Sequence, residues 1–136
     1  MTASSRGNSQ GGKNVQTKQV KQEHVALRKE LVAALAAFDD ANAELRQELR
    51  AVLAVTRRYR RQIEMGGRAS DLNRFGDVAG QRRQVSTALA GFEQARQRTH
   101  RAIFRLATEE GESLTSLARA WGISRQLVSR ILHGSP

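Results

Sequence analysis

The stretch from about Val20 to Met65 constrains most strongly how this chain can fold. It contains neither proline nor glycine, and its larger apolar side chains recur at alternating spacings of four and three residues. This period is typical of a helix that packs against another helix, as in coiled coils. The predicted heptad fills positions a and d as follows: Leu35, Asn42, Leu49, Thr56 and Ile63 at a, and Leu31, Phe38, Leu45, Val52 and Tyr59 at d.

The apolar stripe of this predicted helix is wider than a simple two-stranded coil needs. Leu53 and Val55 flank the seam, and a wide stripe favours a bundle of three or more helices. Asn42 has two interpretations. Within the seam it would fix register and partner number at some cost in stability, whereas on the rim of the helix it would be partly exposed.

A second long helix is predicted after an interruption at residues 65–70. Paired glycines in that segment end the first helix, and Ser70 or Asp71 can cap the short helical piece that follows. Apolar periodicity returns over residues 81–110, which makes a helical hairpin. Two helices bury too little apolar surface to be stable alone, so we expect a homodimer through helices 20–65 and 81–110. The repeating residues of the second helix are Val85, Leu89, Phe92, Thr99, Ile103 and Leu106.

The segment Ser113–Gly134 has the composition of two short helices joined by a tight turn. Ser113 and Ser124 are candidate N-caps, because a hydroxyl can accept a bond from an unpaired backbone N–H. Gly122 and Gly134 stand where a helix ends in a left-handed conformation. Apolar residues fall on one face of each short helix, with one more at the corner: Leu114, Leu117, Ala118 and Trp121 in the first, Leu127, Val128, Ile131 and Leu132 in the second, and Ile123 between them.

The run L-A-R-A-W-G-I-S-R-Q-L-V-S-R resembles the bacterial helix-turn-helix family, particularly the homeodomain-like variety of resolvase-type DNA-binding ends and small repressors. Four positions carry the resemblance: Ala118 where the helices cross, Gly122 in the turn, Ser124 at the start of the second helix and Val128 in the core. The resemblance covers about the last quarter of the chain. Because such a motif needs a third helix to cover its inner face, we expect Ala102, Ile103 and Leu106 to supply it.

The resemblance implies that the second short helix lies in the major groove of DNA. If Val128 faces the core, then Arg125, Gln126, Ser129 and Arg130 face outward. Arginine can bond both guanine acceptors, and glutamine can do the same with adenine. This face is therefore the predicted reading surface.

Phosphate contacts are predicted around that surface. Ser124 and the N-terminal N–H groups of the second helix suit a phosphate oxygen. Leu127 either packs inward or touches a thymine methyl group. Four arginines in the preceding helix are expected to contact phosphates: Arg96, Arg98, Arg101 and Arg105.

The net charge of +10 favours a polyanionic partner such as DNA, RNA or an anionic membrane. Residues 57–106 hold twelve arginines and four acidic residues, whereas residues 107–136 are balanced with three of each. The positive field is thus expected from the helices before the motif. The cluster Arg57–Arg61, near the predicted hairpin tip, either binds a second DNA segment, RNA or an acidic protein, or is simply solvated.

Several classes of function find no support in the sequence. There is no cysteine, and His24, His100 and His133 are too far apart to suggest a metal site. A glycine-rich phosphate loop, a membrane span and the apolar core of a secretory signal are also missing. We therefore expect a non-enzymatic protein without cofactor, located in the cytoplasm with the nucleoid. A small-molecule ligand is neither implied nor excluded.

The sequence thus predicts an all-α chain in three regions: a disordered basic tail (1–18), a helical hairpin for dimerisation (19–92) and a helix-turn-helix domain (93–136). The expected function is sequence-specific binding of double-stranded DNA by a small dimeric transcriptional regulator. Two alternatives stay open. One is an architectural or segregation protein of low sequence specificity, and the other is a helical module that binds another protein.

Overall fold

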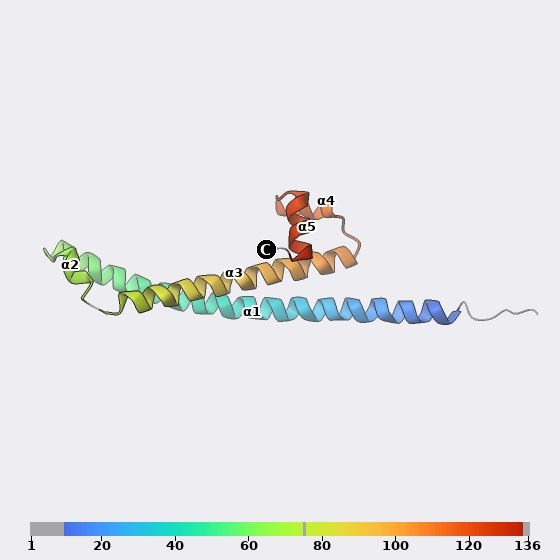
Figure 1. The fold of residues 1–136 in the computed structure, drawn as a ribbon, viewed down its shortest axis with the longest axis horizontal. Coiled ribbons are helices and arrows are strands. Elements are labelled where there is room, and N and C mark those ends of the chain that lie inside the picture. The colour runs from blue at the N-terminus through green and yellow to red at the C-terminus, as the bar shows by residue number, and fades with distance from the viewer. Residues whose placement is uncertain (1–9, 75, 135–136) are drawn as a thin grey trace, which may run out of the picture. The chain divides into compact units, whose positions relative to one another are not determined.

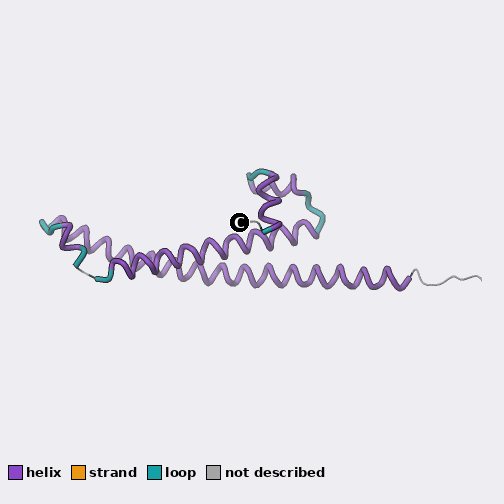
Figure 2. Tube along the Cα trace, viewed as in Figure 1, coloured by secondary structure: helices purple, strands orange, loops and turns teal. Residues whose placement is uncertain are grey.

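The computed structural model describes residues 10–74 and 76–134, in which every regular element is an α-helix, as predicted (Figures 1 and 2). The chain divides into two compact units, Ala34–His100 and the combination of Met1–Ala33 with Arg101–Pro136. We call them the hairpin unit and the head unit. The helices are α1 (Gln10–Glu64), α2 (Ala69–Leu72), α3 (Val78–Glu109), α4 (Leu114–Trp121) and α5 (Arg125–His133).

Two predicted boundaries differ from those of the structure. Residues 10–18, assigned to a disordered tail, belong to α1, and residues 1–9 lie outside the described part of the chain. The segment K-N-V-Q-T-K at 13–18 contains no proline or glycine, so nothing in it stops the helix. The C-terminal part of the head unit starts at Arg101, later than the predicted domain boundary at 93.

In the hairpin unit α1 and α3 run antiparallel and pack side by side (Figure 1). The rings of Phe38 and Phe92 lie 5.1 Å apart, centroid to centroid, with their planes tilted by 37°. The Thr99 hydroxyl lies 3.3 Å from the carbonyl oxygen of Ala34 and 2.8 Å from that of Ala95. These contacts join the two helices and satisfy a buried hydroxyl.

Most of the predicted a positions of α1 do not form its contact with α3, whereas the predicted d positions do. The predicted d residues from Phe38 to Tyr59 are half-buried as expected, but Leu35, Leu49 and Ile63 at predicted a positions are 44–49% exposed. The apolar stripe of α1 is wider than the surface that a single neighbouring helix can cover. Small alanines in α1 also let α3 approach closely at the residues beside the predicted a positions. The residues immediately before the predicted a positions are buried or half-buried instead: Ala34, Ala41, Glu48, Val55 and Gln62.

The predicted glycine stop at the end of α1 is confirmed. Gly66 has φ 87°, and the Gly67 N–H donates to the Gln62 carbonyl at 2.8 Å. A side chain at position 67 would place its Cβ only 2.8 Å from that same oxygen. The second glycine is therefore required by close approach of the backbone.

The predicted caps after this stop are wrong. The structure shows a side-chain cap further along, at the start of α3. Ser70 and Asp71 lie inside α2, whose N-cap is Arg68 without a side-chain hydrogen bond. Asp77 instead opens α3, because its Oδ1 accepts from the Gly80 N–H at 2.8 Å. Asp77 is an acceptor at a helix N-terminus, the usual arrangement of an N-cap.

The head unit encloses a true core where the end of α3 meets α4 and α5. Phe104 and Val128 are fully buried, and the Phe104 ring meets Trp121 edge-on at 4.9 Å. Of the predicted α3 contributors, only Ile103 packs against this core, whereas Ala102 and Leu106 are buried without belonging to it. Phe104, the central residue, is absent from that prediction. Around these side chains pack Ile103, Ala107, Leu114, Ile123, Ile131 and Leu132.

Candidate nucleic-acid interface

The position of α5 is fixed by caps that the sequence predicts correctly. The Ser113 hydroxyl accepts from the Ser116 N–H and the Ser124 hydroxyl from the Leu127 N–H, both at 3.1 Å. Gly122 ends α4 with φ 64°, and the Ile123 N–H then donates to the Ala118 carbonyl at 3.0 Å. This bond closes a turn of Schellman type, which connects the helices through only Gly122, Ile123 and Ser124.

The inner face of α5 packs into the core, which leaves a polar outer face. Val128 is fully buried, and Ile131 and Leu132 pack against the same cluster. The orientation predicted for the helix is therefore confirmed. On the outer side Arg125, Gln126 and Arg130 are exposed, and Ser129 is half-buried.

The N-terminus of α5 presents backbone donors as well as side chains. Ser124 is exposed, and its hydroxyl is engaged by the Leu127 N–H. That cap leaves the N–H groups of Arg125 and Gln126 directed out of the helix end, where anions are favoured. Leu127 itself is half-buried, so part of its side chain lies at the surface beside them.

Arg101 anchors α5 to α3. Its Nε donates to the Ile131 carbonyl at 3.3 Å, near the C-terminal end of α5, where a cation is favourable. Its guanidinium also lies against Gly134, since a Cβ there would sit 3.5 Å from the guanidinium carbon. Arg101 was predicted as a phosphate ligand, and the structure gives it a positioning contact within the head. Arg105, one turn further along α3, is exposed.

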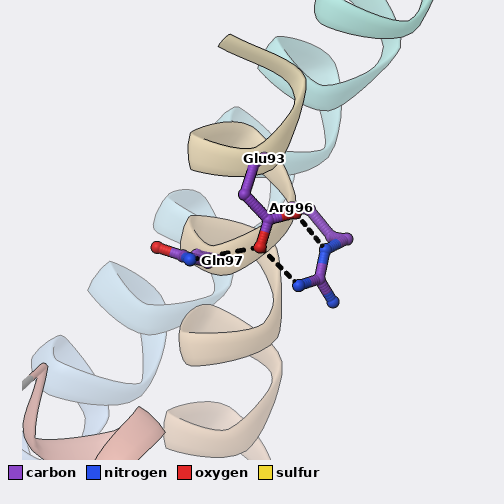
Figure 3. Close-up of polar contacts among 3 residues, drawn as sticks. All are labelled: Glu93, Arg96 and Gln97. Atoms are coloured by element: carbon purple, nitrogen blue, oxygen red, sulfur yellow. Dashed lines mark hydrogen bonds and ion pairs between the residues drawn. The ribbon is translucent and has the colours of Figure 1, made fainter. Parts of the chain in front are cut away.

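Arg96 is held in an ion pair on the surface of α3 (Figure 3). Its Nε and Nη2 donate to the two carboxylate oxygens of Glu93 at 2.7 and 2.6 Å, and Gln97 donates to the same carboxylate at 3.2 Å. The Arg96 hydrogen bonds lower the pKa of Glu93 to about 2, and the bond to Glu93 raises the pKa of Arg96. The pair therefore stays charged at neutral pH, and most of the Arg96 charge is balanced locally.

The nearby His100 adds little positive charge at neutral pH. Burial lowers its pKa, and the Arg96 charge acts in the same direction, while Glu93 opposes them. The i,i+3 spacing of Glu93 and Arg96 is readable in the sequence as an ion-pair signal, although Arg96 is predicted above only as a phosphate contact.

The structure thus brings together one part of the predicted site. Arg125, Gln126, Ser129 and Arg130 share the outer face of α5, and Arg101 and Arg105 belong to the same head unit. Arg96 and the exposed Arg98 belong to the hairpin unit. The arrangement can present hydrogen-bond donors and acceptors on one rigid helix face.

Neither a metal site nor a membrane span finds a candidate in the described part of the chain. No three histidine, aspartate or glutamate side chains there are grouped as metal ligands would be. Among the helices of residues 10–74 and 76–134, none has the length and apolar character that crossing a bilayer demands.

Comparisons with known proteins return no relative. The chain matches no protein-family model, no curated protein sequence and no solved structure.

Proposed function

We propose that this chain is a DNA-binding protein of helix-turn-helix type that reads the major groove of double-stranded DNA through α5. The observation that carries the proposal is the outer face of α5, which is polar and exposed while Val128 fixes the inner face in the core. Arg125 and Gln126, in the first turn, reach base edges, and Ser129 and Arg130 extend the contact by one turn.

Phosphate contacts position this helix on the duplex. The N-terminal N–H groups of α5 and the exposed Arg105 contact the backbone, and Arg98 and the free edge of Arg101 add to the positive field. Arg96 contributes less than the sequence suggests, since Glu93 balances its charge. The protein acts as a nucleoid-associated transcriptional regulator and binds without cofactor or chemical step.

The regulator works as a homodimer. A two-fold dimer presents two copies of α5 to a palindromic site whose half-sites lie about 34 Å, or a multiple of that distance, apart.

Selection of preferred sequences from random duplexes, followed by affinity measurements across salt concentrations, tests this proposal. The wild-type chain should bind the selected sequence at least about 1,000-fold more tightly than the random pool. Arg125→Ala should cost about 1–3 kcal/mol on the selected sequence and relax preference at one base position. Arg105→Ala should weaken binding to all duplexes and reduce the slope of log K against log salt by about 1.

Arg50→Ala is the matched control, because it removes an exposed arginine of α1 in the hairpin unit. It should leave sequence preference unchanged. The reading role of α5 is refuted if a chain carrying both Arg125→Ala and Arg130→Ala retains full discrimination between selected and random duplexes.

An architectural DNA-binding role is the second candidate, and the arginine distribution favours it. The exposed Arg57, Arg58 and Arg61 lie at the end of α1, with Arg82 and Arg83 near the start of α3. Such a surface binds duplexes without reading their sequence. Equal affinity for all duplexes with a steep salt dependence, reduced by Arg82→Ala and Arg83→Ala together, would support this role over the first.

A further inference from the structure

The hairpin unit is short of buried apolar side chains. Among its described residues, the buried positions are two alanines and a threonine: Ala34, Ala88 and Thr99. Two helices packed along one strip cannot enclose large side chains between them. The larger apolar residues of this unit must therefore be covered from outside or stay in water.

Five of the exposed large apolar residues lie on one flank of the hairpin, while Met65 and Val78 lie outside it, at the end of α1 and the start of α3. In α1, Leu35, Leu49 and Ile63 each directly follow a residue of the strip that faces α3, and Leu53 lies one turn from Leu49. In α3, Leu89 likewise follows the buried Ala88. In an antiparallel helix pair these equivalent heptad positions fall on the same side of both helices. We call these five residues, 44–49% exposed, the apolar flank: Leu35, Leu49, Leu53, Ile63 and Leu89.

The opposite flank has a different chemistry. It holds a shallow hollow whose rim carries carboxylates, amides and a guanidinium, among them Glu44, Gln47, Arg83 and Gln84. Thr87 of α3 also lines this hollow. The contrast indicates that one flank is suited to solvent and the other to a protein surface.

The apolar flank is complementary to itself about the level of Asn42. The Phe38–Phe92 and Ala34–Thr99 contacts set the register of the helices and place Leu89 close to Asn42 along the hairpin. Leu35 and Leu49 lie seven residues before and after Asn42. These two leucines therefore place apolar side chains at equal distances on both sides of Asn42.

Two exposed charges of opposite sign lie beside the flank at nearly equal distances from Asn42. Asp39 lies three residues before Asn42, and Arg46 lies four residues after it. A two-fold axis across α1 at this level brings Asp39 of each copy to Arg46 of the other. It also brings Leu35 to Leu49 and places Leu89 against its own counterpart. A two-fold interface requires this kind of self-complementarity, in which each contact occurs twice.

We propose that a second copy of this chain packs on the apolar flank, with its α1 antiparallel to the first, about a two-fold axis near Asn42 and Leu89. The four helices then form a bundle in which the flanking leucines become core. Asn42 lies at the axis and pairs with the same residue of the second copy, which fixes the register. The proposal does not depend on DNA binding, since it rests on the hairpin unit alone.

Crosslinking through a single introduced cysteine tests the axis, because the chain has no cysteine of its own. Leu89→Cys in the full chain should form a disulfide-linked species of two 15.1 kDa chains under mild oxidation. Thr87→Cys, exposed on the same helix but facing the hollow, is the control and should stay unlinked. Leu35→Cys should link poorly alone and efficiently when mixed with Leu49→Cys. Equal linking through positions 87 and 89, or linking of Leu35→Cys only to itself, would overturn the arrangement.

Sedimentation without DNA tests the surface. Leu49→Glu should raise the dimer dissociation constant at least ~10-fold, whereas Ala51→Glu, exposed on the same helix away from the flank, should leave it within ~3-fold. Circular dichroism reports whether each variant keeps its helices. If Leu49→Glu unfolds, sedimentation of charge variants tests the same surface. Asp39→Arg should weaken the dimer, and the double variant Asp39→Arg with Arg46→Asp should restore it. A wild-type chain that sediments as a single copy at all concentrations refutes the proposal, whatever its affinity for DNA.

Discussion

The head unit and the hairpin unit bury their apolar side chains in opposite ways. In the head unit, Phe104 and Val128 are fully enclosed. In the described hairpin unit, the enclosed side chains are small, while Leu49 and Leu89 are each 49% exposed. Both units are built from amphipathic helices, so apolar content alone does not decide whether a segment has a core.

The number and direction of the helices explain this difference. In the head unit the end of α3 meets two short helices, α4 and α5, and a side chain between them is contacted from several sides. In the hairpin unit two antiparallel helices share one narrow strip, which small residues such as Ala34 and Ala88 fill best. A hairpin of this kind gains a core only when further helices cover its flank.

Truncation of Phe104 should give the largest loss of stability. A small loss would contradict the difference in burial between the head unit and the hairpin unit. Phe104→Ala removes a ring enclosed by α4 and α5 and should lower the free energy of unfolding by about 3–5 kcal/mol. Chemical denaturation followed by Trp121 fluorescence measures this, because that indole packs against the lost ring. Met65→Ala, at a residue 86% exposed, is the control and should change little. Equal effects of the two substitutions would mean that the head has no independent core.

The same glycine substitution should have opposite signs in the two units. Gly122 adopts φ 64° in the turn, and a Cβ there would meet no atom within 4 Å, so its cost is conformational. Gly122→Ala should therefore destabilise by about 1–2 kcal/mol. Gly91 lies within α3 and is equally free of neighbours, but its backbone is helical. Gly91→Ala should stabilise by about 0.5–1 kcal/mol.

Thermal or chemical unfolding of the two variants side by side provides the measurement, and each serves as the control for the other. Stabilisation by Gly122→Ala would contradict the left-handed turn on which the orientation of α5 depends.

Most caps and turns decided by neighbouring residues were predictable from the sequence, with the caps at Ser70 and Asp71 as the exception, whereas features decided by helix crossing were not. Ser113, Gly122 and Ser124 were assigned correctly because a cap or a left-handed turn depends on chemistry within four residues. Phe104 was missed because Ile103 fits the period along α3 equally well, and the choice between them depends on the angle at which α4 and α5 cross. Leu49 was predicted in the seam because it lies four residues after Leu45, a helical spacing. Glu48, three residues after Leu45, has an equally helical spacing and is the residue that lies in the strip facing α3.

The candidate site divides in the same way. The outer face of α5 follows from its period once Val128 is inside. The Glu93–Arg96 pair could have been read from its i,i+3 spacing. The partner of Arg101 required the structure, because it lies thirty residues away and a long arginine side chain can reach a carboxylate, a carbonyl or solvent from the same backbone position.

The smallest effect is expected from the Glu93–Arg96 ion pair, whose side chains are 47% and 41% exposed. The pKa of the Glu93 carboxyl is about 2 in the folded chain, below the ordinary value of 4.5. A carboxyl with a depressed folded pKa stabilises the fold above its ordinary value, and this contribution is lost as pH falls from about 4.5 towards 2. Glu93→Gln should therefore flatten the dependence of the unfolding midpoint on pH in that window, matching the wild type near pH 2 and lying slightly below it at pH 7.

Glu44→Gln removes another carboxylate of the hairpin unit and is the matched control for this test. Both variants and the wild-type chain are unfolded at one chain concentration between pH 2 and pH 7, so that self-association affects them equally. If Glu93→Gln follows the wild-type pH profile, the ion pair contributes nothing to folding. The stability of the hairpin unit would then rest on its remaining contacts and its packing, and it should rise with chain concentration if a second copy covers the apolar flank.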